Sequence, residues 1–107
     1  MALLIQYTLI FASVLMLVAL GESRYQSYCS VCHGDSAVSG GVLPDLRYAP
    51  ALANPALWRR IVQGGLLAPG GMVSFAGQLS RGQIEAVRDY VIARAHQTEG
   101  ERAARPY

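Results

Sequence analysis

The chain begins with an uninterrupted apolar stretch. Residues 1–20 contain no charged side chain, and only Gln6, Thr8 and Ser13 are clearly polar. A helix of about 20 apolar residues is long enough to cross a bilayer. The pattern therefore predicts a hydrophobic N-terminal segment, Met1 to Leu20, that is separate from the folded domain.

Two interpretations of this segment fit the residues. Ala19-Leu20-Gly21 supplies the small-x-small site of a cleavable signal peptide, but no Lys or Arg precedes the apolar stretch. The length suits a retained membrane anchor better, although an anchor also lacks the flanking positive charges that set orientation. The segment is thus an anchor or a signal peptide, and an anchor would associate the chain with a membrane.

Two later segments carry the start signals of helices. Pro55 follows the N-cap residue Asn54, and a pair of glycines closes that segment. Ser80 and Gln83 have the spacing of a capping box at the start of the second segment. We therefore expect two short amphipathic helices. Their apolar stripes are Leu57, Trp58, Ile61 and Val62 in the first, and Ile84, Val87, Tyr90 and Val91 in the second.

The remaining chain has no polar and apolar alternation long enough to predict a strand. A third helix is expected over Glu22 to Cys32, and Gly-containing loops are expected over residues 39–50 and 64–77. Residues 97–107 are polar and charged, which predicts a flexible C-terminal tail. The expected fold class is all-α, with long loops that need a buried body to pack against.

Length and composition leave little material for a core. The chain has 107 residues, and the part after residue 20 is small enough to need a disulfide, a metal or another staple. The only cysteines, Cys29 and Cys32, would close a trivial loop as a disulfide. We therefore expect these two thiols to serve a purpose other than a disulfide bond. A net charge of +2 without a clustered basic face argues against nucleic acid as a partner.

The cysteines lie in Cys29-Ser30-Val31-Cys32-His33, which is the Cys-x-x-Cys-His pattern of covalent haem attachment. Two thiols three residues apart on a helical turn face the same side, so each can add to one vinyl group of a haem. His33 then lies under the iron and can give an imidazole nitrogen as the fifth ligand. We expect one haem c, bound through both cysteines, which also supplies the missing core.

Two other uses of the motif are weaker. A thioredoxin-like pair needs a preceding strand within an α/β pattern, and the sequence predicts neither. A structural zinc site needs four ligands, and only His96, far along the chain, is left to join Cys29, Cys32 and His33. Haem attachment is therefore the leading interpretation.

Met72 is the one methionine after the N-terminal segment, and it follows two glycines in a loop. A thioether is a suitable soft axial donor, so we expect His33 and Met72 to be the two iron ligands from the protein. The alternative is a loop methionine that only fills a gap. His96 is the other nitrogen candidate, and it would give a bis-histidine centre of lower potential.

The expected occupation of both axial positions of the iron by protein ligands indicates a function. With both positions occupied by protein, oxygen and peroxide have no open coordination site. This favours an electron carrier over an enzyme, passing single electrons between redox partners such as a dehydrogenase or an oxidase. The alternative is a haem-based sensor or peroxidase in which Met72 is absent from the iron or easily displaced. Rapid binding of carbon monoxide to the reduced protein would indicate that alternative.

From Gly21 to Ala95 the sequence resembles a class I monohaem cytochrome c. More narrowly, residues 42–47 and 72–75 are similar to the C-terminal cytochrome domain of quinohaemoprotein (PQQ-dependent) alcohol dehydrogenases. The resemblance implies a small cytochrome c fold of three to four short helices around the haem, with a cytochrome c domain over residues 21–96. The residues that carry it are Gly21, Tyr25, Cys29, Cys32, His33, Gly34, Met72 and Tyr90.

The resemblance also implies a setting. Haem is joined to such motifs outside the cytoplasm, which implies a periplasmic or periplasm-facing domain, with the inner membrane as the site of any anchor. The implied partners are redox proteins of a respiratory chain or a dehydrogenase complex. The family further implies that helices starting near Gly21 and Ser80 cross closely, with the glycine against an aromatic-bearing face. We expect Tyr25 and Tyr90 in the core there.

Further site residues follow from the resemblance. Pro44 matches the proline whose carbonyl accepts a hydrogen bond from the proximal imidazole, here His33 Nδ1. Arginine and indole N–H groups can hydrogen-bond haem propionates. For each candidate of this kind, a solvated or core position fits the sequence equally well. These candidates are Arg47, Trp58, Arg59 and Arg60.

Overall fold

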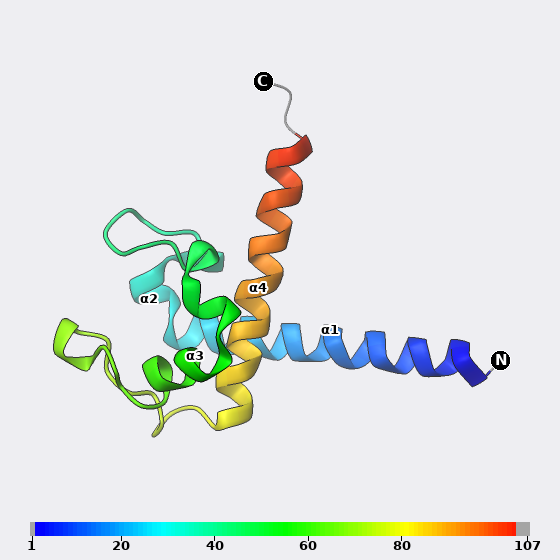
Figure 1. The fold of residues 1–107 in the computed structure, drawn as a ribbon, viewed down its shortest axis with the longest axis horizontal. Helices are drawn as coiled ribbons and strands as arrows, with labels where there is room; N and C mark the ends of the chain where they lie inside the picture. Colours follow the sequence, from blue (N-terminus) through cyan, green and yellow to red (C-terminus); the bar gives the residue numbers. More distant parts are fainter. Residues whose placement is uncertain (1, 105–107) are drawn as a thin grey trace.

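The computed structural model describes residues 2–104 and is all-α (Figure 1). Its helices are α1 (Ala2–Tyr28), α2 (Ser30–His33), α3 (Pro55–Val62) and α4 (Arg81–Ala104). Short 3₁₀ turns lie in the connections: η1 (Asp35–Ala37), η2 (Leu46–Tyr48), η3 (Pro50–Ala53) and η4 (Ala68–Gly70). No strand occurs among residues 2–104, so the expected fold class is confirmed.

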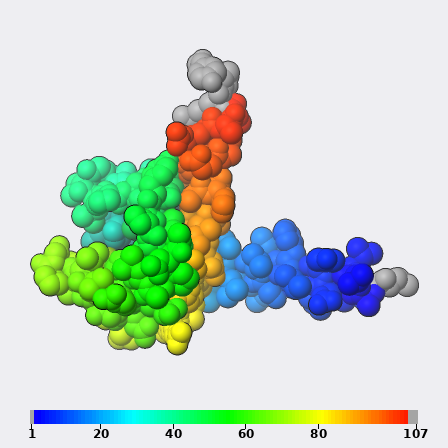
Figure 2. All heavy atoms as spheres, viewed as in Figure 1, coloured from blue at the N-terminus to red at the C-terminus, as the bar shows by residue number. Residues whose placement is uncertain are grey.

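The apolar segment and the first helix of the domain form one element. α1 is a continuous helix of 27 residues, whereas the sequence predicts a separate apolar segment over residues 1–20 and a helix that starts at Glu22. Neither Pro nor a cap signal interrupts the chain there, so the helix runs on. By length and composition α1 is able to cross a membrane, and a signal sequence passes the same test. Its N-terminal part projects alone from the body of the protein (Figure 2).

The predicted caps of α3 and α4 are confirmed. The backbone N–H of Leu57 donates to Asn54 Oδ1 at 3.1 Å. At the start of α4, the Gln83 N–H donates to Ser80 Oγ at 3.2 Å and the Ser80 N–H donates to Gln83 Oε1 at 2.8 Å. This is a reciprocal capping box. The predicted stripes face inward, and their buried members are Trp58, Val62, Ile84, Val87, Tyr90 and Val91.

α4 is longer than the sequence predicts. Residues 97–104 continue it as a helix, where the composition predicts an irregular tail. Thr98 is buried in this stretch, and its hydroxyl accepts from Arg47 Nη1 at 2.8 Å and donates to the Arg94 carbonyl at 2.9 Å. A contact 51 residues away along the chain, which local composition does not reveal, thus ties this stretch to the domain. Residues 105–107 of the predicted tail lie outside the described residues.

The core is centred on the crossing of α1 and α4 (Figure 1). A Cβ atom at Gly21 would lie 1.9 Å from the Ala86 carbonyl oxygen, so only glycine allows the helices to approach this closely. Tyr25 and Tyr90 pack edge to face there, with ring centroids 5.4 Å apart, and both are buried. The close crossing that the family resemblance implies is confirmed.

Candidate functional site

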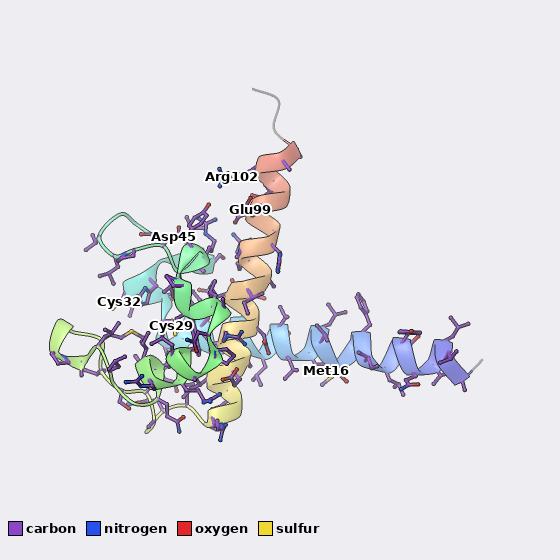
Figure 3. The ribbon with its side chains drawn as sticks, viewed as in Figure 1. Met16, Cys29, Cys32, Asp45, Glu99 and Arg102 are labelled. Atoms are coloured by element: carbon purple, nitrogen blue, oxygen red, sulfur yellow. The ribbon has the colours of Figure 1, made fainter. Side chains whose placement is uncertain are left out.

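The Cys-x-x-Cys-His residues form one tight turn directly after α1. The backbone N–H of His33 donates to the Cys29 carbonyl at 2.9 Å, and that of Cys32 donates to the same oxygen at 3.2 Å. Both thiols are unbridged, with Cys29 half-buried and Cys32 exposed (Figure 3). The structure therefore brings the two thiols and the imidazole of the motif together within one helical turn.

Tyr25 and Gly34 fix the end of this turn. The Tyr25 hydroxyl donates to the Gly34 carbonyl at 2.6 Å, and burial raises the pKa of this phenol well above its ordinary value. Gly34 has a φ of +92°, and a Cβ atom there would lie 1.9 Å from the Val38 carbonyl oxygen. The glycine after the motif is thus required by both conformation and space, and it turns the chain sharply beyond His33.

Among residues 2–104, no protein group accepts a hydrogen bond from Nδ1 of His33. Its Nδ1 atom is buried without a partner, and burial lowers its pKa, so the imidazole is neutral and able to ligate at neutral pH. The expected hydrogen bond from Nδ1 to Pro44 is not made, and Pro44 is exposed. A buried, unpartnered ring nitrogen costs about 1 to 3 kcal/mol, so this imidazole lowers stability as long as Nδ1 has no partner.

Met72 lies on a loop that contacts the end of α1, directly before the motif. The ring of Tyr28, next to Cys29, packs edge to face on Phe75 with centroids 6.5 Å apart. The Phe75 N–H also donates to the Val62 carbonyl at 2.8 Å, which fixes the loop to the end of α3. Met72 is half-buried against the core. The donor set of two free thiols, an unpartnered imidazole and a thioether fits a covalently attached haem.

The competing uses of the motif find no support in the geometry. Among residues 2–104, no three His, Cys, Asp or Glu side chains are grouped as metal ligands, so the geometry gives no support to a zinc site. Burial and the neighbouring Cys32 raise the pKa of Cys29 to about 11, whereas redox-active thiols have a lowered pKa. His96, the other nitrogen candidate, is exposed on α4.

Two of the expected propionate partners are engaged elsewhere. Arg47 donates from Nη2 to Asp45 Oδ2 at 2.7 Å and from Nη1 to Thr98 Oγ1 at 2.8 Å, so it joins a loop to α4. Trp58 is buried, and its indole N–H donates to the Ile84 carbonyl at 3.1 Å. Each of these two side chains thus satisfies a protein group, and their role at the haem propionates stays a prediction.

The other two candidates lie on the surface of α3. Arg59 approaches Glu85 at 3.5 Å in a partly exposed ion pair. Arg60 is exposed, and within residues 2–104 its side chain has no hydrogen bond or ion pair. Arg60 is thus the one of the four candidates whose guanidinium the structure leaves uncommitted to another protein group.

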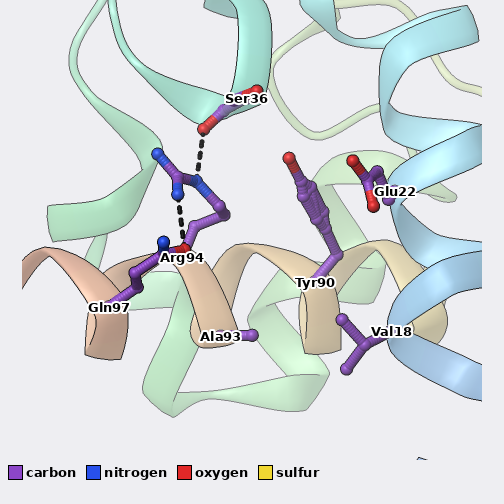
Figure 4. A pocket seen from close by; sticks show the side chains of 7 residues that line it. All are labelled: Val18, Glu22, Ser36, Tyr90, Ala93, Arg94 and Gln97. Carbon is purple, nitrogen blue, oxygen red and sulfur yellow. Dashed lines mark hydrogen bonds between the residues drawn. The ribbon is translucent and has the colours of Figure 1, made fainter. Parts of the chain in front are cut away.

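Two surface pockets lie away from the motif. One of about 220 Å³ lies between α1, α4 and the η1 turn, where Arg94 donates to the Ser36 carbonyl at 2.9 Å and to Gln97 Oε1 at 2.6 Å (Figure 4). Another of about 320 Å³ lies along α3 beside Arg59 and Arg60. Neither is lined by a motif residue or by Met72, so neither pocket marks the candidate site.

The residues that brace the site were not identified from the sequence. Tyr28 and Phe75 connect the motif to the Met72 loop, and Asp45 binds the backbone N–H groups of Ser39 and Arg47. For Tyr28 and Phe75 the sequence offers one signal, which is the position of the aromatic residue Tyr28 next to the motif. The Asp45 network depends on a loop conformation that local patterns do not specify.

The Asp45 network predicts a pH dependence of stability. The Arg47 guanidinium lowers the pKa of Asp45 to about 2, below the value near 3.9 of an unfolded chain. A depressed folded pKa stabilises the protein above about pH 4, and this contribution is lost as pH falls toward 2. Across that range we expect the free energy of unfolding of wild type to fall by about 2 kcal/mol more than that of Asp45→Asn.

Urea titrations at pH 5 and pH 2.5, followed by Trp58 fluorescence, measure this difference. Glu99→Gln is the matched control, because Glu99 is exposed and pairs only with Arg102 at 3.2 Å. Equal pH dependence in wild type and Asp45→Asn would contradict the predicted role of Asp45.

Comparisons with known proteins agree with this geometry. The sequence model of the family described as cytochrome C oxidase, cbb3-type, subunit III matches residues 17–91. The dehydrogenase subunit of the quinone alcohol dehydrogenase of Gluconobacter oxydans (strain 621H) is 41% identical over 78 residues, covering 73% of this chain and 10% of the relative. Cytochrome c550 of Pseudomonas aeruginosa is 35% identical over 77 residues, covering 69% of this chain and 53% of the relative.

A solved structure shares the fold. The quinohemoprotein alcohol dehydrogenase ADHIIG from Pseudomonas putida HK5 aligns with a TM-score of 0.72 and 41% sequence identity. The match covers 79% of this chain and 12% of that one. The chain therefore spans about a tenth of the length of the alcohol dehydrogenases that it matches, in the region of their cytochrome domain.

Proposed function

Because this chain belongs to the cytochrome c family described by the cbb3-type oxidase subunit III model, which implies haem c and electron transfer, we propose that it is a single-haem electron carrier. In this proposal Cys29 and Cys32 would hold the haem covalently, and His33 and Met72 would be the iron ligands. The observation that carries it is the motif turn, in which two free thiols and the His33 imidazole lie on one helical turn.

In this proposal the surrounding residues of the chain position His33 and Met72 and take no part in a chemical step. Haem, when bound, supplies a one-electron iron couple. The Tyr25 hydroxyl on the Gly34 carbonyl holds the turn that carries His33. The Tyr28 and Phe75 rings hold the loop that carries Met72. A haem held by both His33 and Met72 would have no open position for oxygen or peroxide, which favours an electron carrier over a peroxidase or a sensor.

The setting and partners are part of the proposal. The curated relatives include alcohol dehydrogenase subunits, which supports a redox protein such as a dehydrogenase or an oxidase as the partner. Covalent haem attachment through a Cys-x-x-Cys-His motif supports an extracytoplasmic, periplasm-facing domain. The apolar N-terminal part of α1 supports either export by a signal sequence or retention at the membrane as an anchor.

Substitution of Met72 tests the proposed ligand set. We expect the oxidised wild-type protein to be low-spin and to show the iron-to-methionine charge-transfer band. In Met72→Ala this band disappears, the ferric haem becomes high-spin, and the reduced protein binds carbon monoxide rapidly. The potential also falls, because ligation by Met and His raises it. Absorption spectra and a redox titration of the full chain, exported from a haem-maturing host, measure these changes.

Two variants serve as controls. Met16→Ala removes a methionine that is exposed on α1 and should keep the charge-transfer band (Figure 3). His96→Ala should keep a low-spin spectrum, whereas its loss would indicate bis-histidine ligation. A wild-type protein that is high-spin or binds carbon monoxide rapidly would favour the sensor or peroxidase and overturn the carrier.

A further inference from the structure

The pocket between α1 and α4 holds two opposite charges that do not pair. Glu22 lines it from α1 and Arg94 lines it from α4. Within residues 2–104, neither side chain forms an ion pair with the other or with any further charged group. A carboxylate and a guanidinium that share a pocket of about 220 Å³ without meeting leave room for a group between them. They favour a ligand that carries both a positive and a negative charge.

Arg94 has donors left for such a ligand. Its Nε donates to the Ser36 carbonyl at 2.9 Å, and its Nη1 donates to Gln97 Oε1 at 2.6 Å. A guanidinium carries N–H groups on all three of its nitrogens, so Nη2 remains for a bound group. The two protein contacts also hold the guanidinium in place, and a fixed fork of donors suits a phosphate.

The lining has a polar end and an apolar end (Figure 4). Arg94 and Tyr90 rise from the same side of α4, and Glu22 faces them from α1. The phenol of Tyr90 can donate a hydrogen bond to a phosphate oxygen. Val18 and Ala93 lie at the other end, toward the N-terminal part of α1. This order matches an amphiphile with a polar head and an apolar tail.

The height of the pocket along α1 coincides with the edge of a bilayer. Residues 2–20 span about 28 Å of helix, close to the roughly 30 Å of a hydrocarbon core. Glu22 is the first charged residue of the chain and follows this stretch after Gly21. With α1 retained as an anchor, Val18 therefore lies at the edge of the hydrocarbon, and Glu22 lies at the level of the lipid headgroups.

We propose that this pocket, which we name the headgroup pocket after its lining by Glu22, Tyr90 and Arg94, binds the phosphoethanolamine headgroup of a membrane phospholipid. The inference rests on the anchor alternative of the proposed function. Arg94 donates to the phosphate, and the ammonium group of the lipid donates to the Glu22 carboxylate. The pocket is smaller than the about 300 to 1,000 Å³ of sites for drug-sized ligands, which suits a headgroup.

Other lipid headgroups fit the same charges less well. An anionic headgroup would bring a net negative charge toward Glu22, and Arg94 is the one cation that the lining residues supply. Like charges at close range repel. A phosphocholine headgroup is a zwitterion too, but its quaternary ammonium has no N–H to donate to a carboxylate. The Glu22 carboxylate therefore selects for a primary ammonium.

Native mass spectrometry of the haem-loaded full chain tests this selection. The protein is released from uncharged detergent micelles that contain equal amounts of phosphatidylethanolamine, phosphatidylcholine and phosphatidylglycerol. We expect wild type to retain phosphatidylethanolamine at least about tenfold more than either other lipid. In Glu22→Gln this preference should fall to less than about threefold, because the amide keeps the shape of the side chain and loses its charge.

Glu99→Gln is the matched control. It removes the same charge from an exposed position on α4 that does not line the pocket. Its lipid preference should equal that of wild type. Equal retention of the three lipids by wild type, or an unchanged preference in Glu22→Gln, overturns the headgroup pocket.

Soluble glycerophosphoethanolamine, which has the same headgroup without acyl chains, separates the two sources of this chemistry. We expect it to displace the lipid only at an excess of at least about tenfold, because it lacks the apolar contacts. Displacement at equal concentration would assign the pocket to a soluble zwitterion and overturn the lipid site. Cleavage of the exported chain before Glu22 would overturn it as well. Both outcomes leave the carrier intact, whereas a chain without covalent haem overturns the proposed function alone, since no proposed haem residue lines the pocket.

Discussion

Gly21→Ala is expected to destabilise the protein by about 3 kcal/mol or more, because the new methyl group has no space at the helix crossing. A Cβ atom at this position would lie 1.9 Å from the Ala86 carbonyl oxygen and 2.9 Å from Tyr90 Cβ. Both neighbours belong to α4, so relief requires the two helices to separate. That separation would also loosen the packing of Tyr25 on Tyr90, which braces the turn at Gly34.

The same substitution at Gly100 provides the control. Gly100 also lies inside a helix, but a Cβ atom there has no neighbour within 4 Å. Gly100→Ala should therefore stabilise the protein by about 0.5 to 1 kcal/mol through helix propensity alone. Urea unfolding followed by Trp58 fluorescence measures both variants, since Trp58 is the only tryptophan and is buried. Equal stability of Gly21→Ala and wild type would mean that the helices do not cross closely.

Cys29→Ala/Cys32→Ala is expected to lose all haem that survives denaturation. Without the two thioether bonds the porphyrin is held only by its axial ligands and by packing, and a domain this small has little other core to retain it. We expect haem staining on a denaturing gel to fall to background and the yield of coloured protein to drop at least tenfold. Either single variant keeps one attachment point and should retain part of the stain.

Val31→Ala is the control for the cysteine variants. Val31 lies inside the motif, but its side chain is 88% exposed, so its removal should leave haem attachment intact. A loss of stain in Val31→Ala as large as in the double cysteine variant would indicate that any change to this turn blocks maturation. Full haem retention in the double variant would place the attachment elsewhere and contradict the proposed site.

Local signals in the sequence predict the caps of α3 and α4 correctly and the extents of α1 and α4 poorly. The caps at Asn54 and Ser80 use residues within three positions of each helix start, so they are readable from sequence. The end of α4 depends instead on the contact of Thr98 with Arg47. The start of α1 was misread because a fall in hydropathy near residue 20 is not a helix stop.

The candidate site also has a part that local sequence predicts and a part that it does not. The motif from Cys29 to His33 is contiguous, so its residues and their expected chemistry follow directly from their spacing. The partners of Trp58 and Arg47 lie 26 and 51 residues away, at Ile84 and Thr98, and only the folded chain brings them together. Their role at haem propionates stays a prediction from the resemblance, while the structure shows the contacts that they make within the protein.

Peptide mapping of the exported full chain tests the central proposal most directly. Trypsin cleaves after arginine, and the peptide from Tyr25 to Arg47 contains Cys29, Cys32 and His33 with no internal cleavage site. We predict that this peptide carries the added mass of one haem after extraction with acidified acetone. The same peptide at its bare mass, with two thiols that take up an alkylating reagent, would contradict covalent haem attachment and the electron-carrier function built on it.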